Sequence, residues 1–118
     1  TALNFAINSS DACRVHTLDL APEGHEAGTR VVGDADAQLI QHSRPGIDYQ
    51  GRPEAARIEQ HYGDSMRFDF SPYRNAVDIV FVDGAHHYAA ALSDTRNALD
   101  MVRPGYRSQP EMMRALFR

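Results

Sequence analysis

Three acidic residues stand at the ends of predicted strands, where a side chain can meet a bound ligand. Asp19 ends an alternating segment, Asp64 follows a glycine after another, and Asp83 follows an apolar run. In open parallel α/β sheets, ligands bind beyond the carboxyl ends of the strands. A carboxylate there accepts hydrogen bonds from two adjacent ribose hydroxyls, and Asp19 is the candidate for that role. Acids at strand ends also form turns and cap helices, so that alternative stays open.

A second group of reactive side chains occurs in the sequence Asp83-Gly84-Ala85-His86-His87. Asp83 can bind a divalent cation or a substrate hydroxyl, and Gly84 lets the chain turn close to a ligand. His86 can accept a proton near neutral pH. His86 and His87 are neighbours, so on a helix they point about 100° apart and cannot both face one ion. The alternative is that Asp83 caps the next helix and both histidines are ordinary first-turn residues.

The other reactive side chains are predicted to have structural roles. His16 falls within a predicted strand, and His61 alternates with apolar neighbours. His25 and His42 fall in loops. We expect each of these histidines to be a surface residue or an internally bonded one rather than a ligand. Cys13 borders a turn, and we do not expect it to be a catalytic thiol.

The elements that must position these residues alternate between strand and helix. Residues 15–19 alternate and are rich in β-formers, and residues 57–63 alternate less clearly, so both segments are predicted as strands. The apolar run 79–82 predicts a strand buried on both faces, as in a parallel sheet. This order of elements places the chain in the α/β class with a parallel sheet and flanking helices.

The clearest predicted helix follows the strand that ends before Asp83. It stops at residues 104–105, and its apolar face is formed by Tyr88, Leu92, Leu99 and Val102. Residues 3–7 read as the tail of a helix, and residues 111–118 as a last short helix. The long loop over residues 21–53 has room for one short helix, at residues 34–40.

Composition narrows the classes of function. The chain has 118 residues and a formal net charge of -4 without a basic block, which argues against nucleic-acid binding. All 12 cationic residues are Arg, so Schiff-base chemistry through a lysine is excluded. A single cysteine forms no intrachain disulfide, which favours a cytoplasmic location. No apolar run approaches the ~20 residues of a membrane span.

Several motifs occur together in the order of one known family. They are Val15-His16-Thr17-Leu18-Asp19, then Ile58 to Ser65, then Phe81-Val82-Asp83-Gly84-Ala85-His86-His87-Tyr88, then Asp94 to Gly105. In this order the chain resembles the class I S-adenosylmethionine-dependent methyltransferases, in the branch marked by Phe-Val-Asp-Gly-Ala-His-x-Tyr. That family has a Rossmann-like parallel sheet with flanking helices.

The resemblance implies roles for the residues at the strand ends. Asp19 would bind the ribose of S-adenosylmethionine, and Asp64 with Ser65 would lie near its adenine. Asp83 would line the methyl-transfer site, with His86 as the base. In relatives, the position of Asp83 also contributes to a divalent-metal site together with acids after the next strand, and the sequence after residue 105 lacks those acids.

The family pattern is incomplete in this sequence. The first strand with its Gly-rich turn would precede Thr1, and the strand after Gly105 is absent. In the family's sheet that first strand lies between the strands ending at Asp19 and Asp83, so its loss would leave two unpaired strand edges. We therefore expect residues 1–118 to be a single partial domain. It would be a fragment, receive strands from a partner, associate through open edges as a homo-oligomer, or have an altered sheet order.

Three functions stay open at this point. The first is a fragment or truncated form of an S-adenosylmethionine-dependent methyltransferase acting on an oxygen, or a nitrogen, of a small-molecule acceptor. The resemblance leaves open whether this chain is active alone. The second is a non-catalytic Rossmann-like binding or assembly module that has lost the cofactor cradle. The third is another α/β enzyme, a hydrolase or phosphotransfer domain using Asp83 with a divalent ion.

Overall fold

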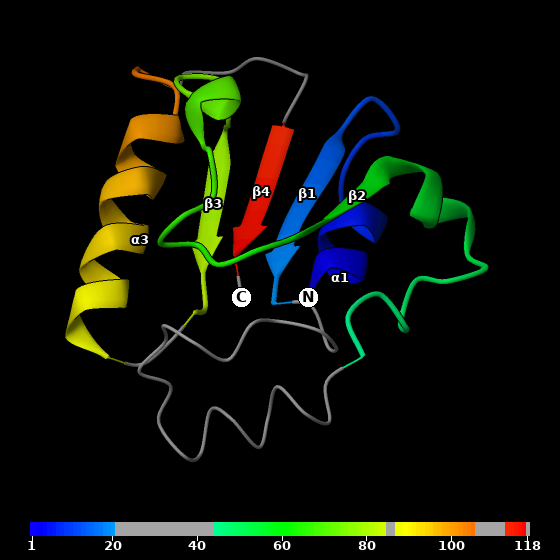
Figure 1. Ribbon diagram of the computed structural model, residues 1–118. Helices are drawn as coiled ribbons and strands as arrows, with labels where there is room; N and C mark the ends of the chain where they lie inside the picture. Colours follow the sequence, from blue (N-terminus) through cyan, green and yellow to red (C-terminus); the bar gives the residue numbers. More distant parts are fainter. Residues whose placement is uncertain (21–43, 85–86, 106–112, 118) are drawn as a thin grey trace.

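The protein forms a parallel sheet with helices on both faces. A computed structural model describes residues 1–20, 44–84, 87–105 and 113–117, the last segment as backbone. The sheet has four strands in the order β2-β1-β4-β3 (Figure 1). Their bounds are β1 Arg14–Asp19, β2 Ile58–Tyr62, β3 Ile79–Val82 and β4 Met113–Phe117. Each neighbouring pair is parallel, which confirms the predicted fold class.

In the described part of the chain, two α-helices and two short 3₁₀ helices accompany the sheet. They are α1 Ala2–Ile7, η1 Pro53–Arg57, η2 Ser71–Tyr73 and α3 Tyr88–Met101. The predicted helix at residues 34–40 lies outside the described residues. Among the described helices, none combines the length and the apolar character needed to span a bilayer.

The sheet separates two hydrophobic clusters. On one face, Ala2 and Ala6 of α1 pack on Val15 of β1. On the other face, Leu18 of β1 packs with Val77 and with Met101 of α3. Because side chains alternate along a strand, residues 15 and 18 necessarily point to opposite faces. The helices therefore cover the sheet from both sides, as in a Rossmann-like fold.

The central strand of the sheet comes from the end of the chain. The prediction of a helix over residues 111–118 is wrong, since β4 runs from Met113 to Phe117 and pairs with both β1 and β3. Glutamate, methionine, alanine and leucine favour a helix locally, but two open strand edges offer backbone hydrogen bonds on both sides. The prediction that a strand after Gly105 is missing is therefore also wrong, because β4 follows Gly105. The expected unpaired edges are filled, and the sheet order is the altered one.

The burial of β3 and α3 differs from the prediction. Ile79, Phe81 and Val82 are 37–40% exposed, because β3 is the outermost strand of the described sheet rather than an internal one. Helix α3 forms as predicted but turns another face inward. Tyr88 and Leu99 are 82% and 72% exposed. The residues of α3 that are buried are Ala90, Asp94 and Met101.

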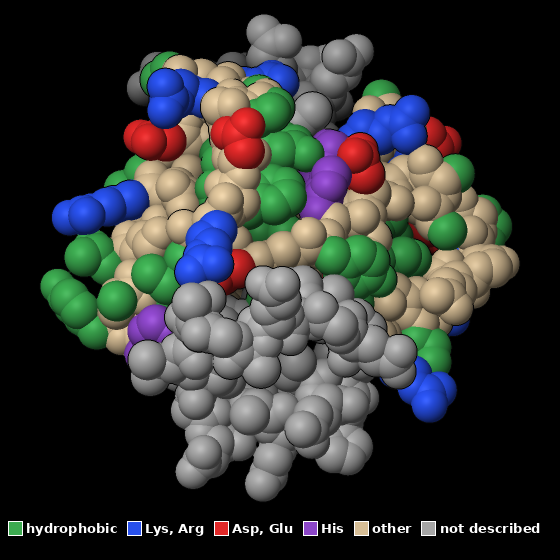
Figure 2. Space-filling model, viewed as in Figure 1, with side chains coloured by type: hydrophobic (Ala, Val, Ile, Leu, Met, Phe, Trp, Pro, Cys, Tyr) green, Lys and Arg blue, Asp and Glu red, His purple; other side chains and the backbone are tan. Residues whose placement is uncertain are grey.

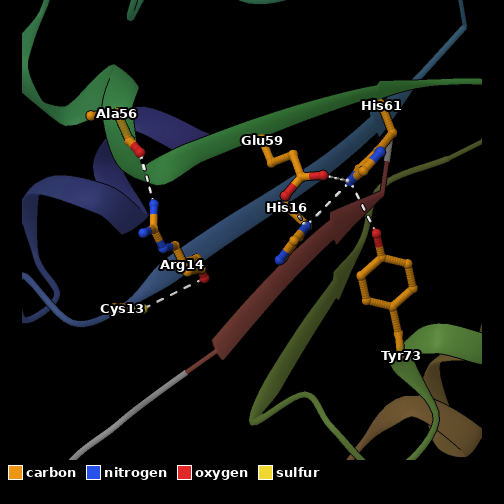
Figure 3. Close-up of polar contacts among 7 residues, drawn as sticks. All are labelled: Cys13, Arg14, His16, Ala56, Glu59, His61 and Tyr73. Atoms are coloured by element: carbon orange, nitrogen blue, oxygen red, sulfur yellow. Dashed lines mark hydrogen bonds and ion pairs between the residues drawn. The ribbon is translucent and has the colours of Figure 1, made fainter.

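Arginine side chains join the start of the sheet to the segment before β2. Arg14 Nη1 donates to the carbonyl of Ala56 at 2.9 Å, as Figure 3 shows. Arg57 donates to the carbonyls of Ala6 and Ser10, both at 2.9 Å. These bonds connect η1 to α1 and to the turn after it, and so fix where β2 begins beside β1.

Candidate functional site

The parallel sheet brings the three candidate acids to one edge. Asp19 is the last residue of β1, and Asp83 directly follows β3. Asp64 stands two residues after the end of β2. At this junction the backbone N–H of Gly63 donates to the carbonyl of Asp19 at 2.9 Å, so the chain after β2 leaves beside the end of β1. This edge, here called the carboxyl rim, is where ligands of such sheets bind.

The Asp19 carboxylate is held by a chain of side-chain hydrogen bonds. Its Oδ2 accepts from Thr17 Oγ1 at 3.1 Å and from Gln60 Nε2 at 2.9 Å. Gln60 is itself oriented by Tyr49, whose hydroxyl donates to Oε1 at 2.5 Å. Thr17 is 3% exposed, which leaves it little freedom to turn away. The network therefore fixes the carboxylate at the rim before any ligand arrives.

Only one oxygen of Asp19 takes part in this network. Within the described part of the chain, both side-chain hydrogen bonds to Asp19 end on Oδ2 and none ends on Oδ1. Asp19 as a whole is half-buried. A carboxylate accepts through both oxygens, and Oδ1 remains able to accept from a ligand hydroxyl.

Asp64 and Ser65 lie in a tight turn that follows β2. Asp64 Oδ1 accepts from the backbone N–H of Met66 at 3.0 Å, and the Asp64 carbonyl accepts from Arg67 and Phe68, both at 2.9 Å. The turn-forming alternative therefore applies to Asp64. A turn of this kind does not exclude ligand binding, because it presents backbone and side-chain groups at the rim. Ser65 is half-buried within the same turn.

Asp83 is exposed at the end of β3 and does not cap the following helix. The cap is His87, whose Nδ1 accepts from the backbone N–H of Ala90 at 3.4 Å. The capping alternative for Asp83 is thus wrong. His86, the predicted base, lies outside the described residues.

The glycine after Asp83 is required by a buried carboxylate. A Cβ atom at Gly84 would lie 2.8 Å from Asp94 Oδ2, closer than real Cβ contacts allow. Asp94 is 3% exposed, and its Oδ1 has no hydrogen-bond partner among the described residues. Asp94 therefore lies against Gly84, the residue that follows Asp83.

A comparison with known protein families identifies the family of the chain. The family model described as "Methyltransferase domain" matches residues 2–106, which include all of the rim residues. The chain belongs to this family. No curated protein and no solved structure gives a significant match to this methyltransferase domain.

The rim residues of the methyltransferase domain fit its implied cofactor better than they fit a metal ion at Asp83. Oδ1 of Asp19, which accepts no hydrogen bond from another described residue, suits a ribose hydroxyl of S-adenosylmethionine. Among the described residues, by contrast, Asp83 belongs to no group of three side chains that could hold a metal ion. We therefore derive no step through a metal at Asp83.

A cavity of about 190 Å³ lies away from the carboxyl rim. It is formed between the segment around η2 and the last turns of α3, near the start of β3, and is lined by Phe68, Asp69, Arg74, Asn97, Asp100 and others. None of the predicted site residues lines it. It therefore supplies no wall for the site at Asp19 and Asp83.

Sequence reasoning missed the residues that support the rim. Thr17 and Gln60 hold Asp19, and Asp94 packs against Gly84. Thr17 could have been found, because a residue two positions before a strand-end acid points to the same side of the sheet. Gln60 and Asp94 depend on strand register and on the rotation of α3, which the sequence pattern did not give.

Proposed function

We propose that this methyltransferase domain binds S-adenosylmethionine at its carboxyl rim and transfers the methyl group to an oxygen of a small molecule, or to a nitrogen. The observation that supports the proposal best is the Asp19 carboxylate, with Oδ2 restrained and Oδ1 free among the described residues. Asp19, Asp64 and Ser65 would form the cofactor side of the site. Asp83 and His86 would form the acceptor side.

Asp19 would bind the ribose with little loss of conformational freedom. Thr17 and Gln60 already hold its carboxylate in place, so less side-chain entropy is lost when a hydroxyl binds to Oδ1. A hydrogen bond to an ionised carboxylate is stronger than one between neutral groups, at about 1.5–3 kcal/mol. The turn at Asp64 and Ser65 would present polar groups to the adenine end of the ligand.

The acceptor side must position a nucleophile and take its proton. S-adenosylmethionine supplies an electrophilic methyl group, whose bond to sulfur breaks as the bond to the acceptor oxygen forms. His86 would take the proton of the acceptor hydroxyl, because imidazole titrates near neutral pH. Asp83 would orient the acceptor through its exposed carboxylate.

Titration calorimetry tests the cofactor site on the chain itself. We expect S-adenosylmethionine to bind, and Asp19→Asn to weaken binding about 10–100-fold, which corresponds to the loss of a charged hydrogen bond. Asp100→Asn is the matched control, because Asp100 is an exposed acid on α3 at the opposite edge of the sheet. Folded protein that does not bind, or that binds equally well with Asp19→Asn, would contradict the proposal. Equal affinities for S-adenosylmethionine and adenosine would favour the non-catalytic binding module.

A further inference from the structure

Three side chains of β1 and β2 meet on the sheet face opposite to Asp19. His16 of β1 lies beside Glu59 of β2 in the strand register, and His61 follows two positions later on β2. His16 Nδ1 lies 3.2 Å from His61 Nε2. Each of these nitrogens lies 3.5 Å from an oxygen of Glu59. Figure 3 shows the three side chains pointing toward one another, and we call them the His–Glu–His cluster.

The sequence predicted His16 and His61 to be surface or internally bonded residues, and both do have side-chain partners. It did not predict that they lie together. Each histidine had been considered alone, whereas parallel pairing of β1 with β2 brings them together. The spacing of Glu59 and His61 was a usable signal, because residues two apart on a strand share a face.

Aromatic rings hold the two imidazoles in place. The His16 and His61 rings stack with centroids 5.5 Å apart. Tyr73 meets both rings edge-on, and Phe68 meets His61 in the same way. The side chains of His16 and His61 are 13% and 21% exposed, but that of Glu59 is 63% exposed. In Figure 2, histidine and acidic side chains adjoin on this face, so the cluster can be reached from solvent.

His61 Nε2 has two competing neighbours in this arrangement. His61 Nε2 lies 3.1 Å from the Tyr73 hydroxyl as well as 3.2 Å from His16 Nδ1. An imidazole nitrogen offers one proton or one lone pair, so His61 Nε2 can bond to only one of these partners at a time. A bound cation would resolve this competition, because both nitrogens could direct lone pairs at it while the Glu59 carboxylate balances its charge.

The dimensions of the cluster match a transition-metal site. Zinc binds imidazole nitrogen at about 2.0–2.1 Å and carboxylate oxygen at about 2.0–2.2 Å, so neighbouring ligand atoms of a tetrahedral site lie about 3.4 Å apart. The separations in the cluster are 3.2 and 3.5 Å.

We propose that His16, Glu59 and His61 bind one Zn²⁺ ion across β1 and β2. Two histidines and one glutamate are the three protein ligands of a site with an open fourth position. The Tyr73 hydroxyl lies 3.1 Å from His61 Nε2 and would donate a hydrogen bond to a water or substrate atom bound at the ion. The site lies on the other face of the sheet from the Asp19 carboxylate, so it does not depend on the proposed cofactor site.

The test uses the tag-free chain after treatment with a chelator. Competition with a chromophoric zinc chelator should show one Zn²⁺ per chain, and Co²⁺ should give the visible absorption bands of a tetrahedral site. We expect His16→Ala and His61→Ala each to weaken Zn²⁺ binding at least 100-fold, more than the ~10–100-fold loss typical when a ligand's supporting partner is removed. Glu59→Gln should weaken it at least tenfold.

Controls separate loss of a ligand from loss of the fold. His87→Ala removes a histidine that caps α3, outside the cluster, and should leave zinc affinity unchanged. Circular dichroism in chelator checks that each variant is folded. If the variants do not fold, the melting temperature of the wild-type chain with and without Zn²⁺ tests the proposal. A ligand that binds only to the native state raises the melting temperature. Absence of a zinc-dependent rise, or full zinc binding in a folded variant lacking both histidines, would overturn the proposal.

Discussion

Replacing Gly84 by alanine tests the close packing of Gly84 against Asp94. The added Cβ would lie 2.8 Å from Asp94 Oδ2, and Asp94 is 3% exposed, so the carboxylate has little room to move. Forcing an extra methyl group into a packed site costs about 1–3 kcal/mol. The change also restricts the unfolded chain, which stabilises the protein by about 0.4–1 kcal/mol. We therefore expect a net loss of about 1 kcal/mol in the free energy of unfolding.

A double-mutant cycle assigns this loss to one contact. In the background of Asp94→Ala the obstructing carboxylate is gone, so Gly84→Ala should be neutral or slightly stabilising. The coupling between the two positions should then be about 1 kcal/mol or more. Asp94→Ala alone should cost little, because its Oδ1 has no hydrogen-bond partner among the described residues and burial of an unpaired polar atom is unfavourable.

Urea unfolding followed by circular dichroism measures all four proteins of the cycle. A loss of 1 kcal/mol corresponds to a fall of roughly 4–8 °C in melting temperature for a domain near 100 residues. If Gly84→Ala destabilises both backgrounds equally, the contact with Asp94 is not the cause. If it stabilises the wild-type background, the steric argument fails altogether.

Three further predictions concern the core, the central strand and the rim. Met101→Ala should lower the free energy of unfolding in urea by about 2–5 kcal/mol, because Met101 is 1% exposed. Leu99→Ala should change it by less than about 0.5 kcal/mol, because Leu99 is 72% exposed. Equal effects would contradict the orientation of α3. A chain ending at Gly105 lacks β4, so its thermal melt should lose cooperativity, and a wild-type-like melt would show that β4 is dispensable. Thr17→Val removes one hydrogen bond to Asp19, so it should weaken S-adenosylmethionine binding several-fold in calorimetry, while unchanged affinity would show that Thr17 does not position the carboxylate.

The fold class followed from local patterns that the structure confirms. Alternation over residues 15–19 predicted β1, and the apolar run 79–82 predicted β3. The same run was misread as doubly buried, because an apolar sequence does not reveal whether its strand lies at the edge. The apolar face of α3 was also misassigned, since alanine and aspartate face inward while Leu99 faces solvent. Burial of small and charged residues depends on neighbouring elements, which a helical period does not identify.

Only the part of the candidate site that depends on local sequence patterns could be predicted. Strand-end positions identified Asp19 and Asp83, because the carboxyl ends of parallel strands share one edge. Two features could be predicted only from the register between β1 and β2. They are the hydrogen bond from Gln60 to Asp19 and the His–Glu–His cluster. Register joins residues more than 40 positions apart, and no local pattern encodes it.

The position of β4 has a consequence for the order in which the sheet can assemble. Arg14 pairs with Met113, so the ladder between β1 and β4 joins segments about a hundred residues apart. As the chain leaves the ribosome from its amino end, β1, β2 and β3 are all synthesised before β4. Until then β3 has no described strand to pair with, and β1 has only β2. The last strand to be synthesised is therefore an inner strand of the sheet. A ribosome that stalls before residue 113 would release a chain in which the edges of β1 and β3 are unpaired, and aggregation begins on such exposed strand edges.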